Sequence, residues 1–389
     1  MTVRQPDLDA DLYSDAAIAD PYALYRVIRD LGPSVWLRAH DVWAIGRFRD
    51  VRAALRADHV LVSSRGVAMN DLVNGQGSRI TLTTDGDVHR RLRKVLMKPM
   101  MPSALREVQA EIQTLADELV ARLVARDSFD GITDFAEHLP IAVVSHLVGL
   151  PEEGRQRMRE WASATFDALG VMNARGQTAL PVLFDMAGYA GRVERSQLSP
   201  GSWAARLFEA ADEASIEASE VAGLLIDYIA PSLDTTILGM GHLLYQLGRH
   251  PEQWDLVRTN HELIPRAVDE ALRLGSPVRA FTRLAVEDYE VDGTTIGAGE
   301  RVLILYASAN RDERRYADPD RFDVTRDAKD HLGFGHGVHR CAGGYLAQLE
   351  MESLLRAMVT RVGRIEVGDP VLALNNVLQG YRSFRASFR

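Results

Sequence analysis

The chain has 389 residues, of which 46% are hydrophobic and 25% charged, a composition typical of a soluble globular protein with a substantial core. Its net charge of −9 argues against nucleic acid as the main partner, because phosphate binding needs a basic face. The single cysteine excludes an intrachain disulfide and gives no support to an oxidising compartment, so we expect a cytoplasmic protein.

The first part of the chain predicts short strands and one basic helix. Residues 1–30 lack the apolar stretch of a signal peptide or membrane anchor, and residues 34–47 alternate as short strands do. A helix expected over residues 89–98 carries a cluster of basic side chains, namely Arg90, Arg91, Arg93, Lys94 and Lys98. A solvated helix face is the simplest interpretation of this cluster, and a docking surface is the alternative.

Helices dominate the rest of the chain. Apolar residues recur at spacings of three and four over 105–125, 217–248 and 344–362, while strand-like runs with glycine turns are confined to segments such as 288–306. No repeat or linker separates two folding units. We therefore predict a mostly α fold with small peripheral β-sheets, formed by residues 1–389 as a single domain.

The segment 217–248 is long and apolar enough to span a bilayer, but Asp227 and Asp234 lie in its middle, where ionisable groups are costly in lipid. We therefore expect a helix buried in protein, and no membrane association. Pro231 removes a helical hydrogen bond, and Asp234 and Thr235 are poor residues for a helix interior. A sequence that disrupts its own helix suggests a functional site.

The only cysteine, Cys341, lies in the glycine-rich and histidine-rich stretch "HLGFGHGVHRCAGG" at residues 331–344. An inert buried cysteine is the simplest interpretation. Zinc would need more ligands at characteristic spacing, and a Cys/His nucleophile would need a base and an oxyanion site that nothing nearby supplies. A heme thiolate would need a backbone that curls beneath the sulfur and lets a flat ring approach, and glycine suits that task.

The stretch "FGHGVHRCAGG" closely resembles the heme-ligand loop of the cytochrome P450 monooxygenases, whose pattern is Phe-Gly-x-Gly-x-His-x-Cys-x-Gly. Every fixed position of that pattern is filled. Upstream, Glu270 and Arg273 are similar to the Glu-x-x-Arg pair that maintains the fold of this family, and similarity to soluble bacterial members extends over nearly the whole chain. The resemblance implies a cytochrome P450 fold, with non-covalent heme b as the cofactor and Cys341 as its iron ligand.

The resemblance also implies roles for residues around the heme. Phe334 and Gly335 would surround the sulfur. Partners for the two heme propionates would be His89, Arg93, Arg283 and His339. Asp234 and Thr235 match the acid and alcohol that manage dioxygen and its protons, although Pro231 and Ser232 replace the usual small residues before them and put the shape of the oxygen groove in doubt.

The function implied is insertion of one atom of dioxygen into a small, largely apolar substrate, by hydroxylation or O-dealkylation, with an aromatic compound as one candidate. Asp227 would disfavour an anionic substrate if it faced the pocket. A ferredoxin-type donor would dock where Arg340 joins the basic helix. The alternatives are a peroxide-driven heme enzyme, a non-catalytic heme sensor and, more distantly, a Cys/His hydrolase. Candidate pocket residues are Ala230, Leu233, Val278, Phe281 and Leu378.

Overall fold

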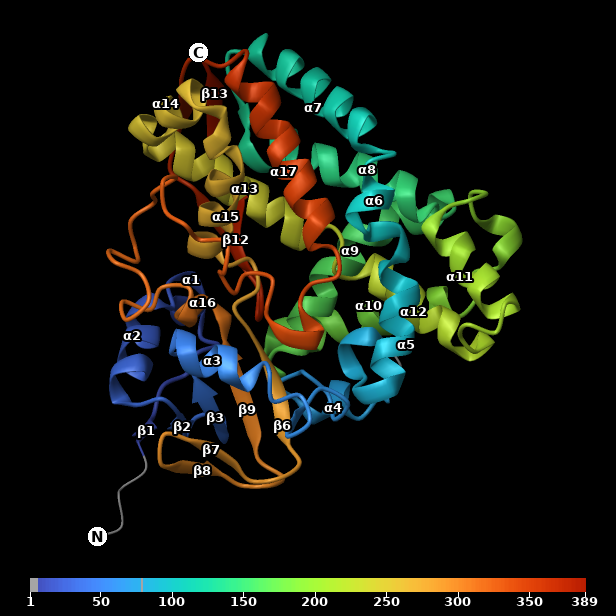
Figure 1. Cartoon of the computed structure of the whole chain (residues 1–389), viewed down its shortest axis with the longest axis vertical. Coiled ribbons are helices and arrows are strands. Elements are labelled where there is room, and N and C mark those ends of the chain that lie inside the picture. Colours follow the sequence, from blue (N-terminus) through green and yellow to red (C-terminus); the bar gives the residue numbers. More distant parts are fainter. Residues whose placement is uncertain (1–5, 78–79) are drawn as a thin grey trace.

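The computed structural model describes residues 6–77 and 80–389. Helices account for 53% of the residues and strands for 13%, which confirms the predicted mostly α fold with small sheets. The helices gather into one large mass, and the largest sheet lies at the opposite end of the molecule beside α2 (Tyr22–Leu31) and α3 (Phe48–Ala54) (Figure 1).

The remaining α-helices are α1 (Asp15–Ala19), α4 (Asp71–Asn74), α5 (Gly86–Met97), α6 (Pro102–Leu105), α7 (Gln109–Val124), α8 (His138–Val148), α9 (Glu152–Leu169), α10 (Ala174–Ala190), α11 (Trp203–Asp212), α12 (Val221–Ile229), α13 (Asp234–Arg249), α14 (Pro251–Thr259), α15 (Ile264–Gly275), α16 (Tyr306–Ala309) and α17 (Gly344–Val359). Two short 3-10 turns also contribute to the site, η1 (Thr81–Thr83) and η7 (Gly337–His339).

The largest sheet is mixed and has the strand order β1-β2-β3-β9-β6-β4. Its strands are β1 (Asp7–Leu8), β2 (Val35–Leu37), β3 (Val42–Ile45), β4 (Leu61–Val62), β6 (Ala280–Ala285) and β9 (Arg301–Leu305). Three smaller sheets are formed by β10 (Ile365–Val367), β13 (Arg385–Phe388) and β5 (Phe129–Asp130), by β11 (Val371–Leu374) and β12 (Gln379–Ser383), and by β7 (Tyr289–Val291) and β8 (Thr294–Ile296).

The largest hydrophobic core lies between the helices and not against the large sheet. It contains buried side chains from α7, α8, α12, α13, α15 and α17, together with Trp161 from α9, Trp254 from α14 and Phe135 from the segment Gly131–Ala136. Two smaller clusters cover the faces of the six-stranded sheet. The border between the helical core and this sheet is where β6 and the cysteine loop come together (Figure 1).

The structure interrupts the helix predicted over 217–248. Helix α12 ends at Ile229 and α13 begins at Asp234, so four residues around Pro231 separate the two helices. Proline lacks the amide hydrogen needed to continue a helix. The stretch Ala218–Arg249 is long and apolar enough to cross a membrane, but 56% of its most apolar window is buried inside the protein. It therefore has the properties of a core segment.

Glu270 and Arg273 form a fully buried ion pair on α15, with Arg273 Nε 2.6 Å from Glu270 Oε2 and Nη2 2.8 Å from Oε1. Arg273 Nη1 also donates to the backbone oxygens of Asn310 at 2.7 Å and Pro319 at 2.8 Å. The pair therefore ties α15 to the irregular segment that leads to the cysteine loop.

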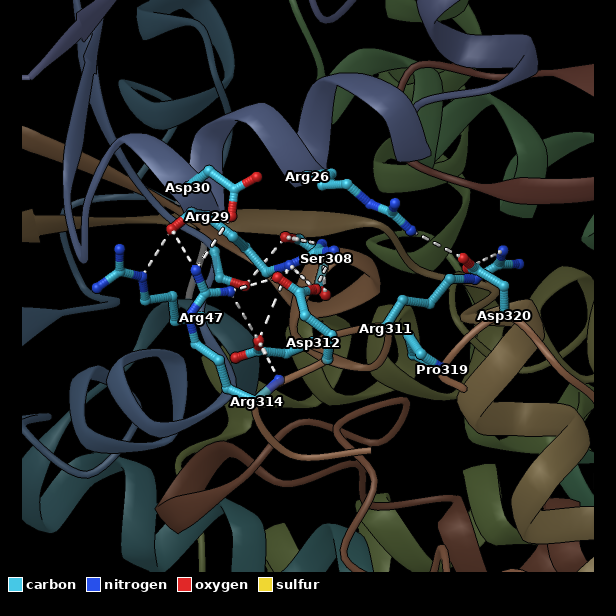
Figure 2. Close-up of polar contacts among 12 residues, drawn as sticks. Arg26, Arg29, Asp30, Arg47, Ser308, Arg311, Asp312, Arg314, Pro319 and Asp320 are labelled. Atoms are coloured by element: carbon cyan, nitrogen blue, oxygen red, sulfur yellow. Dashed lines mark hydrogen bonds and ion pairs between the residues drawn. The ribbon is translucent and has the colours of Figure 1, made fainter. Parts of the chain in front are cut away.

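A second polar network fastens the same segment to α2 (Figure 2). The buried Arg29 guanidinium donates to Ser308 O at 3.2 Å and Ser308 Oγ at 3.1 Å. Arg314 pairs with Asp30 at 3.1 Å, and Asp320 lies between Arg26 at 3.2 Å and Arg311 at 3.1 Å. Contacts from two sides thus hold the chain that approaches the cysteine loop.

Candidate active site

Cys341 lies at the end of a tight loop whose backbone is held by its own hydrogen bonds. The Cys341 N–H donates to Phe334 O at 2.8 Å, and the Gly335 N–H donates to Leu332 O at 2.9 Å. Gly337 has φ of 72°, and a Cβ there would lie 2.4 Å from Leu55 O, so a side chain is excluded. The loop brings the cysteine to the wall of a cavity of about 490 Å³.

The Cys341 sulfur faces positive groups. Burial raises the pKa of the thiol, while the backbone N–H groups of Gly343 and Gly344 and the guanidinium of Arg93 oppose that rise. Helix α17 begins at Gly344, so its positive N-terminal end adds to this field. The arrangement stabilises a thiolate only in part, and a bound metal ion would complete the ionisation.

Basic side chains from three elements border the same cavity: Arg93 from α5, Arg283 from β6 and His339 from η7. Arg93 Nη2 donates to Arg340 O, and Arg283 Nη1 donates to Thr282 O at 2.7 Å. In residues 6–77 and 80–389, neither guanidinium has a carboxylate within 4.0 Å. Two largely buried cations thus face the cavity without a counter-charge, which is costly unless a ligand brings the anions.

His339 and His89 play unequal parts in this cationic region. His339 Nε2 lies 3.2 Å from Asp85 Oδ1, and burial lowers the pKa of His339 while Asp85 opposes that change. His89 is absent from the cavity lining. Its ring packs behind His339 with centroids 4.1 Å apart, and its nitrogens lie 2.9 Å from Thr81 O and 3.2 Å from Val338 O. His89, which was predicted to bind a propionate, therefore lies outside the cavity wall and supports the cysteine loop by packing against His339.

The break between α12 and α13 faces the cavity across from the cysteine loop. Ala230, Pro231, Ser232, Thr235 and Thr236 all contribute to the lining. The Thr235 hydroxyl donates to Pro231 O at 2.9 Å, and the Ser232 hydroxyl donates to Tyr228 O. These side chains satisfy carbonyls that the interrupted helix leaves without amide donors.

Asp234 points away from Thr235. Its carboxyl is outside the cavity lining, and burial raises its pKa to about 6, although the Arg159 charge and a hydrogen bond with Ser163 oppose that rise. Arg159 in turn pairs with Glu137 at 2.6 Å. The acid and the alcohol predicted to act together thus occupy opposite sides of the start of α13.

The five residues predicted for the pocket wall are divided between the cavity lining and the core. Ala230, Val278 and Phe281 line the cavity. Leu233 and Leu378 do not, because Leu233 is buried in the main core and Leu378 packs in a small cluster beside it. Further apolar wall residues come from α9 and α10, namely Phe166, Leu169, Leu183 and Phe184.

Two acids also line the cavity, the half-buried Asp227 on α12 and the buried Glu350 on α17. Glu350 was missed in the sequence, although it falls between Leu346 and Leu354 on the apolar face of its helix. Its Oε1 has no hydrogen-bond partner in the part of the chain that is described, and burial raises its pKa to about 8. An acid at an apolar helical position is the signal that could have identified it.

Comparison with known proteins accounts for this arrangement. Residues 202–362 match the family model described as cytochrome P450. The chain is 35% identical over 384 residues to the cytochrome P450 CYP199A2 of Rhodopseudomonas palustris, with 97% of this chain and 93% of that protein covered. The chain belongs to the cytochrome P450 family. It is also 30% identical to the cytochrome P450 monooxygenase PikC of Streptomyces venezuelae, with 100% of this chain and 96% of the relative covered.

Solved structures give the same result for the fold. The P450BioI structure, in complex with an acyl carrier protein ligated to hexadec-9Z-enoic acid, matches with a TM-score of 0.86 at 26% identity and covers 96% of this chain and 99% of that one. The predicted fold, the monooxygenase class and the heme-thiolate cofactor of this P450 are thereby confirmed.

The residues of this P450 fit protoporphyrin IX heme. The chain has one cysteine, so the attachment motif that needs two cysteines is excluded and the heme is non-covalent. That cysteine borders the cavity, and Arg93 and Arg283 are unpaired cations suited to two propionates. No group of three or more metal-binding side chains exists elsewhere in the described chain.

Proposed function

We propose that this P450 inserts one atom of dioxygen into a small, largely apolar substrate, by hydroxylation or O-dealkylation, with an aromatic compound as the leading candidate. The observation that carries the proposal is the cavity itself, which borders Cys341 on one side and Thr235 on the other and has mainly apolar walls between them. Linalool 8-monooxygenase of Pseudomonas putida, a relative at 28% identity with 94% of each protein covered, is named for a reaction of this kind. We also propose a single catalytic domain in the cytoplasm.

Cys341 is proposed as the iron ligand because it is the only cysteine and the family is heme-thiolate. Bound heme supplies the iron at which dioxygen is activated, and a thiolate ligand favours O–O cleavage. Phe334 and Gly335 would cover the sulfur side. Arg93, Arg283 and His339 would hold the propionates, with His89 supporting His339 from behind.

Thr235 and Asp234 would take part in proton transfer one after the other. The Thr235 hydroxyl lies in the cavity wall and can hold a proton at that surface. Asp234, with its pKa near 6 as a result of burial, can exchange a proton near neutral pH from the side of α9. Because the Asp234 carboxyl faces away from the cavity, a side-chain rotation or a water chain must connect the two residues.

Electrons would come from an acidic ferredoxin-type donor that docks beside the cysteine loop. The basic helix contributes less than expected, since Arg91 pairs with the buried Glu220 at 2.6 Å and Arg90 pairs with Asp87. A different basic group supports the proposal. The Arg52 and Arg56 Nε atoms lie 3.4 and 2.9 Å from the Nε2 of His336, and burial, followed by the charges of these arginines and Arg340, lowers the pKa of that histidine.

The test of the proposed function has two steps. The reduced carbon-monoxide complex should absorb at the red-shifted thiolate position, and an imidazole-like position would contradict the assignment of Cys341. Turnover of small aromatic compounds should then depend on dioxygen and a reduced ferredoxin. Product formed only with hydrogen peroxide would favour the peroxide-driven alternative, and tight ligand binding without any product would favour a heme sensor.

A further inference from the structure

Asp227 is an acid in the wall of the substrate cavity, on α12 and on the same side as Ala230 and Thr235. Its Oδ2 accepts the backbone N–H of Thr81 at 2.7 Å. Within residues 6–77 and 80–389, no cation lies within 4.0 Å of the Asp227 carboxyl. Glu350, the other acid of the lining, is on α17, which follows the cysteine loop on the opposite side.

A structural role alone does not explain a carboxylate at this position. The Asp227 carboxyl accepts hydrogen bonds from both the backbone and the side chain of Thr81, and a neutral acceptor, such as an amide oxygen, could also accept them. A carboxylate in an apolar wall carries a desolvation cost that these two hydrogen bonds do not fully offset. Burial accordingly raises the pKa of Asp227 to about 7, although the Thr81 hydrogen bond and the Arg93 charge oppose the rise.

On the α12 side of the cavity, Asp227 is the strongest polar group in a wall that is otherwise mainly apolar. Ile80, Leu82, Val278 and Phe281 provide apolar surface. The basic side chains of the lining, Arg93, Arg283 and His339, are assigned to the heme propionates under the proposed function. The nearby hydroxyls of Ser232 and Thr235 already donate to backbone carbonyls. A ligand hydrogen-bond donor would find its best acceptor in the Asp227 carboxyl.

We propose that Asp227 anchors the substrate by accepting a hydrogen bond from its hydroxyl or cationic N–H group, and that it excludes substrates with a carboxylate at that end. The substrate class is then a small apolar molecule with one hydrogen-bond donor, such as a phenol or an amidine. This inference rests on the proposed function, because it concerns the substrate of the same cavity. A carboxylate ligand would meet a like charge in a poorly solvated site, whereas a ligand donor would be attracted to the Asp227 carboxylate.

The experiment uses the ferric holoenzyme and four ligands with the same ring: 4-ethylphenol, 4-ethylanisole, 4-ethylbenzoate and 4-ethylbenzamidine. Dissociation constants are measured at pH 8.5, above the Asp227 pKa of about 7 so that the carboxyl is ionised, by equilibrium dialysis and by the shift of the heme spectrum. We expect wild-type protein to bind the phenol or the amidine about tenfold or more tightly than the anisole, because only these ligands donate to a charged acceptor. The benzoate should bind most weakly. The phenol and amidine arms show whether a neutral or a cationic donor is preferred.

The variant Asp227→Asn keeps an oxygen for the Thr81 N–H but loses the charge. It should weaken amidine binding and strengthen benzoate binding, each by about tenfold. Asp87→Asn is the control, because it removes the same charge from a carboxyl that is 93% exposed on α5. Comparable carbon-monoxide spectra for the variants would show that heme binding is intact.

Equal binding of phenol, amidine and anisole by wild-type protein would overturn the inference, whether or not the variant folds. An unchanged order of affinities in Asp227→Asn would also overturn it. Failure of all four ligands to bind would reject this substrate class, while a thiolate-type carbon-monoxide spectrum would leave the monooxygenase assignment standing.

Discussion

Replacement of Arg273 by methionine should destabilise the protein more than any exposed charge substitution. The variant removes the bidentate partner of the Glu270 carboxylate at 2.6 and 2.8 Å and leaves it only Arg326 Nε and the Asp323 N–H, both at 3.1 Å. The cost should therefore lie near the lower end of the about 3 to 5 kcal/mol that is typical of a broken buried ion pair. It also removes the donor from the carbonyls of Asn310 and Pro319, at roughly 1 kcal/mol for each lost hydrogen bond. We expect a total loss of about 5 kcal/mol, which is a large part of the stability of an average domain.

Urea unfolding followed by far-UV circular dichroism measures this loss as a change in the midpoint. Arg356→Met is the matched control, because Arg356 pairs with Glu352 at 2.9 Å on the exposed face of α17. It should cost less than about 1 kcal/mol. The double variant Glu270→Leu/Arg273→Met tests the origin of the effect, since it removes both charges.

The double variant should remain strongly destabilised. Asn310 and Pro319 would still lack their donor, and the Asp323 N–H and Arg326 Nε would lose an acceptor at 3.1 Å. Recovery of wild-type stability in the double variant would refute this reasoning, because it would mean that the two residues only neutralise each other. A loss below about 1.5 kcal/mol in Arg273→Met would refute it as well.

Three further predictions concern the active site and its surroundings. Thr235→Ala should keep the carbon-monoxide spectrum but divert severalfold more reductant to hydrogen peroxide, and Thr235→Ser should restore coupling; unchanged coupling in the alanine variant would exclude the proposed proton role. Burial raises the pKa of Glu350 from 4.5 to about 8, so the folded state binds more protons between these values and wild-type stability falls as pH rises through that range. Glu350→Gln should therefore unfold at higher urea than wild type near pH 8.5, by up to about 4 kcal/mol, and lose this advantage toward pH 5; a constant difference would contradict the assignment. Arg340→Glu and Arg56→Glu should slow reduction by an acidic ferredoxin at least tenfold at low salt but little at high salt, unlike Arg155→Glu on α9, and equal rates for all three would exclude this docking surface.

The features of the site that depend on local backbone could be predicted from the sequence. The cysteine loop is an example, because Gly337 has a positive φ and lies against Leu55 O, so that no other residue fits. The lone cysteine then identifies the only possible thiolate. Arg283 and His339 were found through the family pattern that surrounds them, and both line the cavity.

The features that depend on distant contacts could not be predicted in this way. Arg91 belongs to a basic run in the sequence, but its partner Glu220 is 129 residues away and balances the charge that Arg91 would bring to the expected docking surface. The direction of Asp234 is set by how α13 restarts after Pro231, since a turn of one residue rotates a side chain by about 100° around a helix. The same geometry explains why Leu233, which was predicted to line the pocket, packs in the core instead.

The interruption of the central segment between Ile229 and Asp234 also affects which amino acid substitutions this protein can tolerate. In a continuous helix, a substitution at position 231 or 232 must preserve the hydrogen bonds of the turns on either side. Here α12 and α13 are already separate, and three of the four intervening residues, Ala230, Pro231 and Ser232, face the cavity. Amino acid changes at these three positions can therefore reshape the space for substrate and oxygen at little cost to the folding of either helix. We expect directed evolution for new substrates to accumulate mutations in this segment before it changes the helices themselves.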